Sequence, residues 1–315
     1  MKGIVKNILI SASFVASISA LASAPAQAAS ITNVTTGGTA ASDYYVYDAN
    51  NTNTFRVDSN LTNVNKVLDG NATHPTGNVE LAASSEQAGF DFTTKYTSLT
   101  GSLNGKKITL SSLTASDWTP TFVNNWLTAG LTANGIDSTP IDKLLAPLKL
   151  NTAGFLANIF IQYGGEQRFS DPNISYVNQD DSTGLINIGL AGHHDANSFL
   201  TTSINNYIAD TSVNGTNRGI AKTLLGVLGQ KTIQASEIVK VSYNGSTNLL
   251  YGFNATKSGL VAADDGISHS GNYEVSFHGV LPTSTPVSTP EPSVMLGLLG
   301  VCGVFAGQRK LKKAL

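Results

Sequence analysis

The hydrophobic periodicity of the chain changes twice, and these changes limit the folds that it can adopt. Across residues 43–117 and again across 239–277, apolar and polar residues alternate, as in half-buried strands. Between them, much of 119–229 has the wider spacing of amphipathic helices. This order predicts an α+β fold, with an antiparallel β sheet or sandwich and a helical insertion between the N- and C-terminal strand regions. Two domains divided near residue 118 are the alternative.

Short local signals predict individual elements. Asn104-Gly105 predicts a tight hairpin turn between strands at 99–103 and 108–113. Thr119 and Pro120 predict the N-cap and first residue of a helix that ends at Asn134-Gly135. The apolar segment 153–163 fits either a helix or a buried strand. The other expected elements are strands at 90–96, 174–177, 185–190, 239–243, 249–253 and 273–277, a short helix at 140–146, and helices after Asp195 and after Asn217, the last with Gly229 as its C′ residue.

The charge balance and the cysteine content exclude several classes of function. Residues 29–290 contain 13 Lys and Arg against 20 Asp and Glu, a net charge of −7. Nucleic-acid binding requires a basic face, so no nucleic-acid partner is expected. The one cysteine, Cys302, lies beyond this range. The main domain at 29–281 therefore has no disulfide, cysteine-ligated zinc or thiol chemistry.

The first 28 residues have the pattern of a secretory signal peptide. Lys2 and Lys6 precede an apolar run at 8–21, and Ala26-Gln27-Ala28 provides a small-x-small cleavage site. The run is interrupted by serines and is shorter than the roughly 20 apolar residues of a membrane span. We therefore expect export by the Sec machinery and cleavage by signal peptidase before Ala29.

The C-terminal segment has four parts in a fixed order. A Ser/Thr/Pro linker at 282–289 leads to a short motif, an apolar, glycine-rich run at 294–307 and a basic tail. The run and the tail predict a short transmembrane helix whose basic end stays in the cytoplasm. The residues that carry the motif and begin the tail are Pro290, Glu291, Pro292, Ser293, Arg309 and Lys310.

This order resembles the PEP-CTERM sorting signal of bacterial surface proteins. Thr289, where an aliphatic residue often precedes the motif, and the mixed Arg/Lys tail depart from its commonest form. The resemblance covers 290–315 and implies processing by an exosortase-type membrane enzyme, and often a link to exopolysaccharide. It also implies an inner-membrane intermediate that moves to the cell surface, the outer membrane or the medium. An ordinary C-terminal anchor is the alternative.

The densest group of metal-ligand side chains is His193, His194 and Asp195, preceded by Asp180 and Asp181. Imidazoles and carboxylates bind zinc and other divalent metals, so these five residues are a candidate metal site. Adjacent histidines in a strand point to opposite faces, however, and an aspartate before a helix commonly caps it. The oxygen ligands of Asp171, Asn173, Asp180 and Asp181 form a candidate calcium site.

A polar loop at 162–173 is a candidate ligand-binding site. Its charged residues are Glu166, Arg168 and Asp171, and the guanidinium of Arg168 is suited to a carboxylate or sulfate. The alternative is a turn in which Arg168 pairs with Glu166 or Asp171.

The sequence contains no Gly-x-Ser-x-Gly, Walker or Rossmann motif. The leading hypothesis is therefore a non-enzymatic, exported surface protein, with exopolysaccharide as its candidate partner. A metal-dependent hydrolase centred on His193, His194 and Asp195 and a calcium-stabilised adhesin are the alternatives. Calcium and zinc are the candidate cofactors.

Overall fold

The computed structural model describes residues 28–229 and 231–281. The predicted signal peptide at 1–28, apart from Ala28, lies outside the described residues. The linker at 282–289 and the sorting signal at 290–315, with its expected transmembrane helix, lie outside them too. The described residues as far as Val280 belong to one compact unit.

The larger of two β sheets has nine strands. Their order is β12-β14-β9-β8-β5-β3-β4-β13, and β1 pairs with β8 beside this path. The two-residue pairing of β13 with β4 is parallel, and the other pairings are antiparallel. The strands are β1 (Ala28–Ser30), β3 (Tyr44–Ala49), β4 (Asn53–Val57), β5 (Gly77–Leu81), β8 (Asn173–Asp180), β9 (Leu185–Gly192), β12 (Thr256–Lys257), β13 (Val261–Ala262) and β14 (Gly271–His278).

The smaller sheet is antiparallel and has the order β11-β10-β7-β6-β2. Its strands are β2 (Thr32–Gly38), β6 (Thr97–Leu103), β7 (Lys106–Ser111), β10 (Val239–Tyr243) and β11 (Ser246–Leu250). The predicted turn at Asn104-Gly105 is present, with φ of 47° and 75°, as a hairpin turn with two left-handed residues requires. Because β7 pairs with β10 from the far end of the chain, a domain boundary near 118 would cut this sheet.

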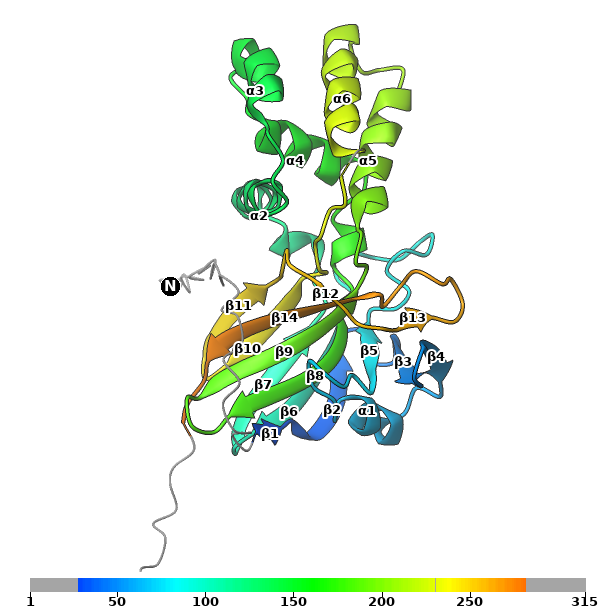
Figure 1. Ribbon diagram of the computed structural model, residues 1–315, viewed down its shortest axis with the longest axis vertical. Coiled ribbons are helices and arrows are strands. Elements are labelled where there is room, and N and C mark those ends of the chain that lie inside the picture. The colour runs from blue at the N-terminus through cyan, green and yellow to red at the C-terminus, as the bar shows by residue number, and fades with distance from the viewer. Residues whose placement is uncertain (1–27, 230, 282–315) are drawn as a thin grey trace, which may run out of the picture. The chain divides into compact units, whose positions relative to one another are not determined.

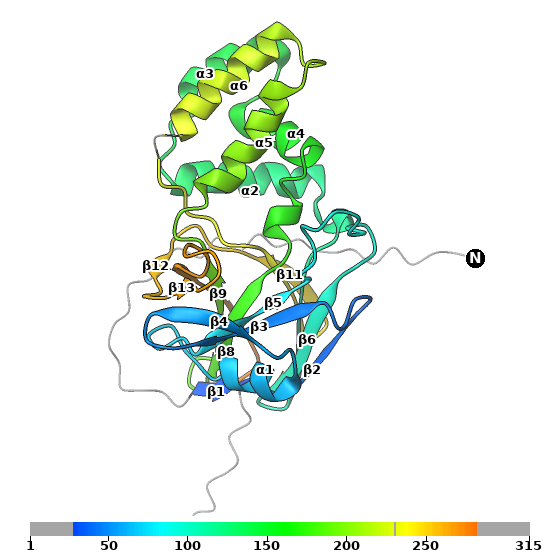
Figure 2. The same cartoon turned by 90° about the vertical axis from the view of Figure 1, so that its right-hand side faces the viewer.

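The two sheets lie one against the other (Figures 1 and 2), with a shared apolar core between them. Val46 and Val79 of the larger sheet and Leu99 and Leu110 of the smaller sheet belong to one fully buried cluster. The short helix α1 (Leu61–Val67) adds its buried Val64 to the same core. The expected α+β class with antiparallel sheets is therefore confirmed.

The helices α2 to α6 gather at one end of the sandwich and form what we call the helical lobe (Figure 1). Between β7 and β8 lie α2 (Pro120–Ala133), α3 (Thr139–Leu145) and α4 (Thr152–Gln162); between β9 and β10 lie α5 (Asn197–Ala209) and α6 (Gly215–Leu228). The helices therefore enter as two insertions, because the β8–β9 hairpin returns to the larger sheet between them. Three single-turn 3₁₀ helices, η1 (Ala115–Asp117), η2 (Ala146–Leu148) and η3 (Gln167–Phe169), complete the fold.

Capping side chains fix the N-terminal ends of α2, α4 and α6, and the cap of α2 is the one predicted from the sequence. The Thr119 hydroxyl accepts a hydrogen bond from the Phe122 backbone N–H at 3.3 Å. Asn151 caps α4 in the same way, at 2.7 Å from the Gly154 N–H. This cap, together with an apolar surface that packs in the lobe, makes the ambiguous segment 153–163 a helix.

Three local expectations were wrong. Residues 90–96 form turns, because the Asp91 carboxylate accepts hydrogen bonds from Thr93 and Thr94. Strand β11 ends at Leu250, and the later aromatic residues of the segment 249–253 pack against the helical lobe. Gly229 has a φ of −63°, so it is not the left-handed C′ residue that was expected.

Within the described ranges, no single helix has both the length and the apolar character to cross a membrane. Two consecutive helical segments, Thr139–Leu148 and Thr152–Gln162, meet both criteria when they are taken together, with a bend of 77° between them.

Candidate functional site

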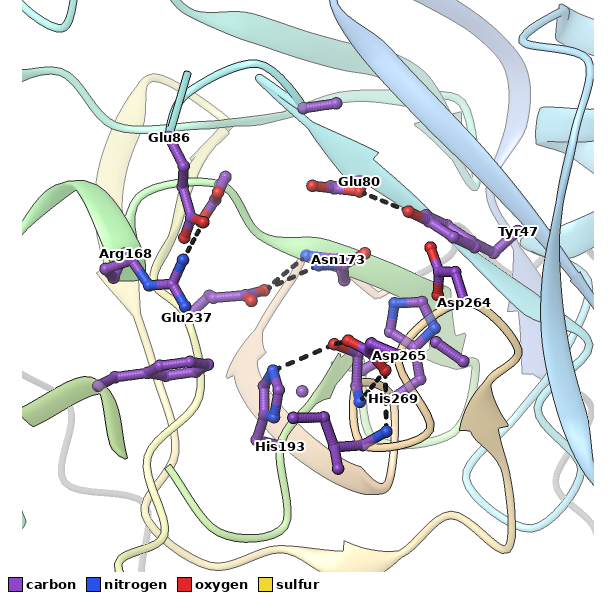
Figure 3. A pocket seen from close by; sticks show the side chains of 18 residues that line it. Tyr47, Glu80, Glu86, Arg168, Asn173, His193, Glu237, Asp264, Asp265 and His269 are labelled. Atoms are coloured by element: carbon purple, nitrogen blue, oxygen red, sulfur yellow. Dashed lines mark hydrogen bonds and ion pairs between the residues drawn. The ribbon is translucent and has the colours of Figure 1, made fainter. Parts of the chain in front are cut away.

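A cavity of about 340 Å³ lies where the larger sheet meets the helical lobe (Figure 3). Its walls come from segments far apart in sequence, including β3, β5, η3, the end of β9, α5 and the loop before β14. Six acidic side chains line it: Glu80, Glu86, Asp171, Glu237, Asp264 and Asp265. Of the described lining residues, Arg168 is the one with a permanent positive charge. The cavity is therefore strongly acidic.

The alternation of β5 places Glu80 in the cavity. Val79 and Leu81 are buried in the sandwich core, so Glu80 projects from the opposite face of the sheet. The Tyr47 hydroxyl donates a hydrogen bond to Glu80 Oε2 at 3.2 Å. Burial, together with the nearby Asp171 carboxylate, raises the pKa of Glu80 to about 8. In the empty cavity at neutral pH, Glu80 is therefore largely protonated.

Glu237 and Asn173 form the centre of the cavity wall (Figure 3). Asn173 is the cross-strand neighbour of Glu80. Its backbone N–H and Nδ2 donate to Glu237 Oε2 at 3.0 and 3.2 Å. Burial and the Asp171 carboxylate raise the pKa of Glu237 well above its ordinary value. The hydrogen bonds from Asn173 lower this pKa, but they do not offset the effects of burial and of the Asp171 carboxylate.

Asp171 is the most buried of these three acids, since Glu80 and Glu237 are half-buried. Its Oδ2 accepts a hydrogen bond from the Ser85 hydroxyl at 2.6 Å. Burial raises the pKa of Asp171 to about 6, against the opposing effects of this bond and of Arg168. The Arg168 guanidinium forms its ion pair with Glu86 and lies 4.4 Å from the centre of the Phe199 ring. The positive charge of Arg168 is thus already paired with an acid at the rim.

The cavity wall also holds an unpaired hydrogen-bond acceptor. Asn173 is only 7% exposed, and its Oδ1 has no hydrogen-bond partner. A buried amide oxygen without a donor costs about 1–3 kcal/mol. A ligand that brings a donor to this position would recover that free energy.

Two neutral histidines line the side of the cavity opposite Glu80 (Figure 3). His193 Nε2 lies 3.2 Å from Ser268 Oγ, and burial lowers the pKa of His193. His269 has a left-handed φ of 61°, and its Nδ1 lies 2.6 Å from Thr54 Oγ1. Burial lowers the pKa of His269 to about 4. Both imidazoles are therefore neutral at pH 7 and add no positive charge.

The structure separates the five residues of the predicted metal site. Asp180 and Asp181 lie at the turn that precedes β9, whereas His193 and His194 follow the opposite end of this strand. The eight residues of β9 separate the two groups by roughly 25 Å. His193 faces the cavity, whereas His194 Nε2 lies 3.3 Å from Gln234 Nε2. The Asp195 carboxylate accepts two backbone N–H bonds, one of them at the start of α5.

The predicted calcium ligands are divided in the same way. Asp171 and Asn173 line the cavity, whereas Asp180 accepts hydrogen bonds from Ser182 and Thr183 in its own turn. Over residues 28–229 and 231–281, no group of three or more His, Cys, Asp or Glu side chains is arranged to hold a metal ion.

The predicted ligand-binding loop contributes two of its three charged residues to the cavity. Arg168 and Asp171 line it, but Glu166 does not. Glu166 Oε2 is buried without a partner, and burial raises the pKa of that carboxyl group to about 7. The ion pair expected within the loop is absent from the described contacts, because Arg168 binds Glu86 instead.

Sequence patterns alone did not indicate Glu80, Glu237, Ser268 or His269 as site residues. Glu80 alternates with Val79 and Leu81 in an ordinary half-buried strand pattern, so no local signal distinguishes it. The others stand in ordinary loop sequences. Comparisons of the chain with protein-family models, curated proteins and solved structures gave no match.

Proposed function

We propose that this protein is an exported surface protein whose acidic cavity binds a ligand that carries a primary amine. The observation that supports this proposal is the group of three acids, the buried Asp171 and the half-buried Glu80 and Glu237, beside an unpaired buried amide oxygen. A ligand that brings hydrogen-bond donors and a positive charge would satisfy Asn173 Oδ1 and favour the ionised form of these acids.

An ammonium group meets both needs. It offers three N–H donors and one positive charge, so it can pair with ionised carboxylates and donate to Asn173 Oδ1. A bare metal ion fits less well, because the described acids and histidines are not grouped as ligands. The volume of about 340 Å³ also lies within the range of small-molecule sites, about 300–1,000 Å³.

An amino sugar is the ligand class that connects this chemistry with the targeting signals. The C-terminal order of residues supports a link to exopolysaccharide, and partly deacetylated polysaccharides carry free amines. The hydroxyl groups of a sugar would also find acceptors in the acidic lining. The natural ligand is therefore proposed to be an amine-bearing sugar unit at the cell surface or in the surrounding matrix.

Calorimetric titration with a glucosamine trimer and its fully N-acetylated counterpart tests this function. At about pH 6, where the sugar amine is protonated, the glucosamine trimer is expected to bind at least about tenfold more tightly. The two trimers differ in charge and acetylation but share the same ring and linkage. Equal affinity, or binding of calcium but not of the amine, would overturn the proposal.

Processing of the two ends is proposed on the sequence signals. Cleavage before Ala29 would leave Ala29 and Ser30 paired with Gln179 and Asn178 in the larger sheet. The intact mass of the protein from its native host is expected to correspond to a chain from Ala29 to the Pro-Glu-Pro motif. A membrane-bound chain that retains Leu315 would instead indicate a plain anchor, and the exosortase and polysaccharide links would be withdrawn.

A further inference from the structure

We propose that Ser268 and His193 form a nucleophile–base pair in the cavity wall, which cleaves an acyl ester of an amine-bearing alcohol or sugar. Ser268 Oγ and His193 Nε2 are 3.2 Å apart, within reach for direct proton transfer. Both side chains line the acidic cavity. The evidence for the pair is independent of the proposed amine-binding function, but the choice of substrate class rests on that function.

The surrounding contacts hold both members in place. The His193 ring meets the Phe199 ring edge-on, with 4.5 Å between the centroids, and its backbone carbonyl accepts the Tyr273 hydroxyl at 2.7 Å. Ser268 bonds through its backbone to Ala262 and to Asp265, at 2.9 Å in each case. These contacts come from β13, β14, α5 and the loop itself, so the pair does not depend on a single element.

The residue after Ser268 has a strained backbone. His269 is a buried, non-glycine residue with a left-handed φ of 61°. Such a conformation costs on the order of 1–3 kcal/mol and persists only where its surroundings impose it. Thr54 Oγ1, at 2.6 Å, and the Tyr47 ring, at 4.7 Å, fix the His269 imidazole. The strained residue turns the loop so that Ser268 and His269 both line the cavity.

Asp265 sets the resting position of the serine proton. The Ser268 hydroxyl donates to Asp265 Oδ2, and the same Ser268 Oγ lies 3.2 Å from His193 Nε2. Rotation of the hydroxyl hydrogen alone transfers the bond from Asp265 to His193. The neutral imidazole then acts as the base, and no backbone movement is required.

The reaction balances with water as the second reactant. Ser268 Oγ attacks the ester carbonyl carbon while its proton passes to His193 Nε2. The bond from the acyl carbon to the alcohol oxygen breaks, and the departing alcohol takes that proton. Water then attacks the acyl-serine and gives a proton to Nε2. The bond to Ser268 breaks, a carboxylic acid leaves, and Ser268 regains its proton.

The two ends of the cavity fit the two parts of such an ester. The buried acids around Glu237 are suited to the amine-bearing alcohol, as proposed above. Ile267, next to the nucleophile, is 59% exposed and lines the mouth. An exposed isoleucine beside Ser268 offers an apolar contact for a short acyl chain. This supports a short acyl ester as the substrate.

Labelling with an alkyl fluorophosphonate tests the pair directly, because the probe reacts with activated serines and needs no natural substrate. Peptide mass analysis of the folded protein is expected to find the probe on Ser268. His193→Gln is expected to slow the labelling by about 100-fold, the range of general-base catalysis. Ser268→Ala should abolish labelling and the hydrolysis of a short-chain 4-nitrophenyl ester.

Ser182 provides a matched control. Its hydroxyl donates to Asp180 in the same kind of turn, at 2.6 Å, but His193 lies at the other end of β9. The proposal predicts labelling of Ser268 and none of Ser182. No labelling of Ser268, or equal labelling of both serines, would overturn it. If His193→Gln fails to fold, the labelling of Ser268 compared with that of Ser182 in the wild-type protein still tests the proposal. Amine binding without labelling of Ser268 would contradict the nucleophile–base pair but not the proposed amine-binding function.

Discussion

The Glu80→Gln variant is expected to be more stable than the wild-type protein by about 4 kcal/mol at about pH 8, and nearly unchanged at about pH 4. The pKa of Glu80 is raised from 4.5 to about 8 by burial and by Asp171. Its stabilising contribution is therefore complete below the unfolded pKa and is lost as the pH rises through about 8. The amide of glutamine carries no charge, so it avoids this loss while it keeps the shape of the side chain.

Urea unfolding of both proteins at the two pH values measures this difference. Glu274→Gln is the matched control, because Glu274 Oε2 also accepts a tyrosine hydroxyl, that of Tyr176 at 2.8 Å, but the residue is exposed. This control variant should differ from wild type by the same amount at both pH values. If Glu80→Gln behaved in the same way, Glu80 would ionise normally, and the electrostatic account of the cavity would be wrong.

Amine affinity is expected to rise by at least about tenfold between pH 5.5 and 8.5, and Glu237→Gln is expected to lower it by about 30-fold at the higher pH. Burial raises the pKa of Asp171 to about 6 and that of Glu80 to about 8, so each acid ionises within this interval. An aliphatic diamine such as 1,4-diaminobutane stays charged throughout, because its amines resemble that of lysine. The pH dependence therefore reports on the protein.

Asp264→Asn is the control for the Glu237 variant. Asp264 also lines the cavity, but it is exposed at the rim, where water screens its charge. Its loss is expected to change the affinity by less than about threefold. Similar losses for the two variants would mean that the acidic rim attracts the amine and that the buried acids do not bind it.

The elements that the sequence predicted are those specified by local signals. The Asn104-Gly105 turn and the Thr119 cap depend on neighbouring residues alone, so they appear in the structure as expected. The segment 90–96 shows the limit of alternation, because the hydrogen bonds of Asp91 outweigh the strand pattern there. The second insertion of helices could be described only once β8 and β9 were placed in the larger sheet.

The cavity could not be predicted, because its residues meet only through long-range pairing. Glu80 and Asn173 are opposite each other because β5 pairs with β8, almost 100 residues later in the chain. Glu237 reaches the same place after the second helical insertion. By contrast, the sequence did indicate Arg168, Asp171 and His193, because polar groups of that kind are prominent in single loops. It assigned His193 to a metal site and placed Arg168 and Asp171 in a candidate ligand-binding loop, with a turn as the alternative, but it could not show which residues lie opposite them in the cavity.

The number of protons released when the amine binds tests the central claim most directly. Calorimetry of 1,4-diaminobutane binding at about pH 7, in buffers with different ionisation enthalpies, gives this number. An amine that pairs with buried, partly protonated carboxyl groups must displace protons, so we expect a net release on the order of one proton per bound ligand. Binding without proton exchange, or with proton uptake, would show that the amine does not meet the buried acids, and the proposed site would be wrong.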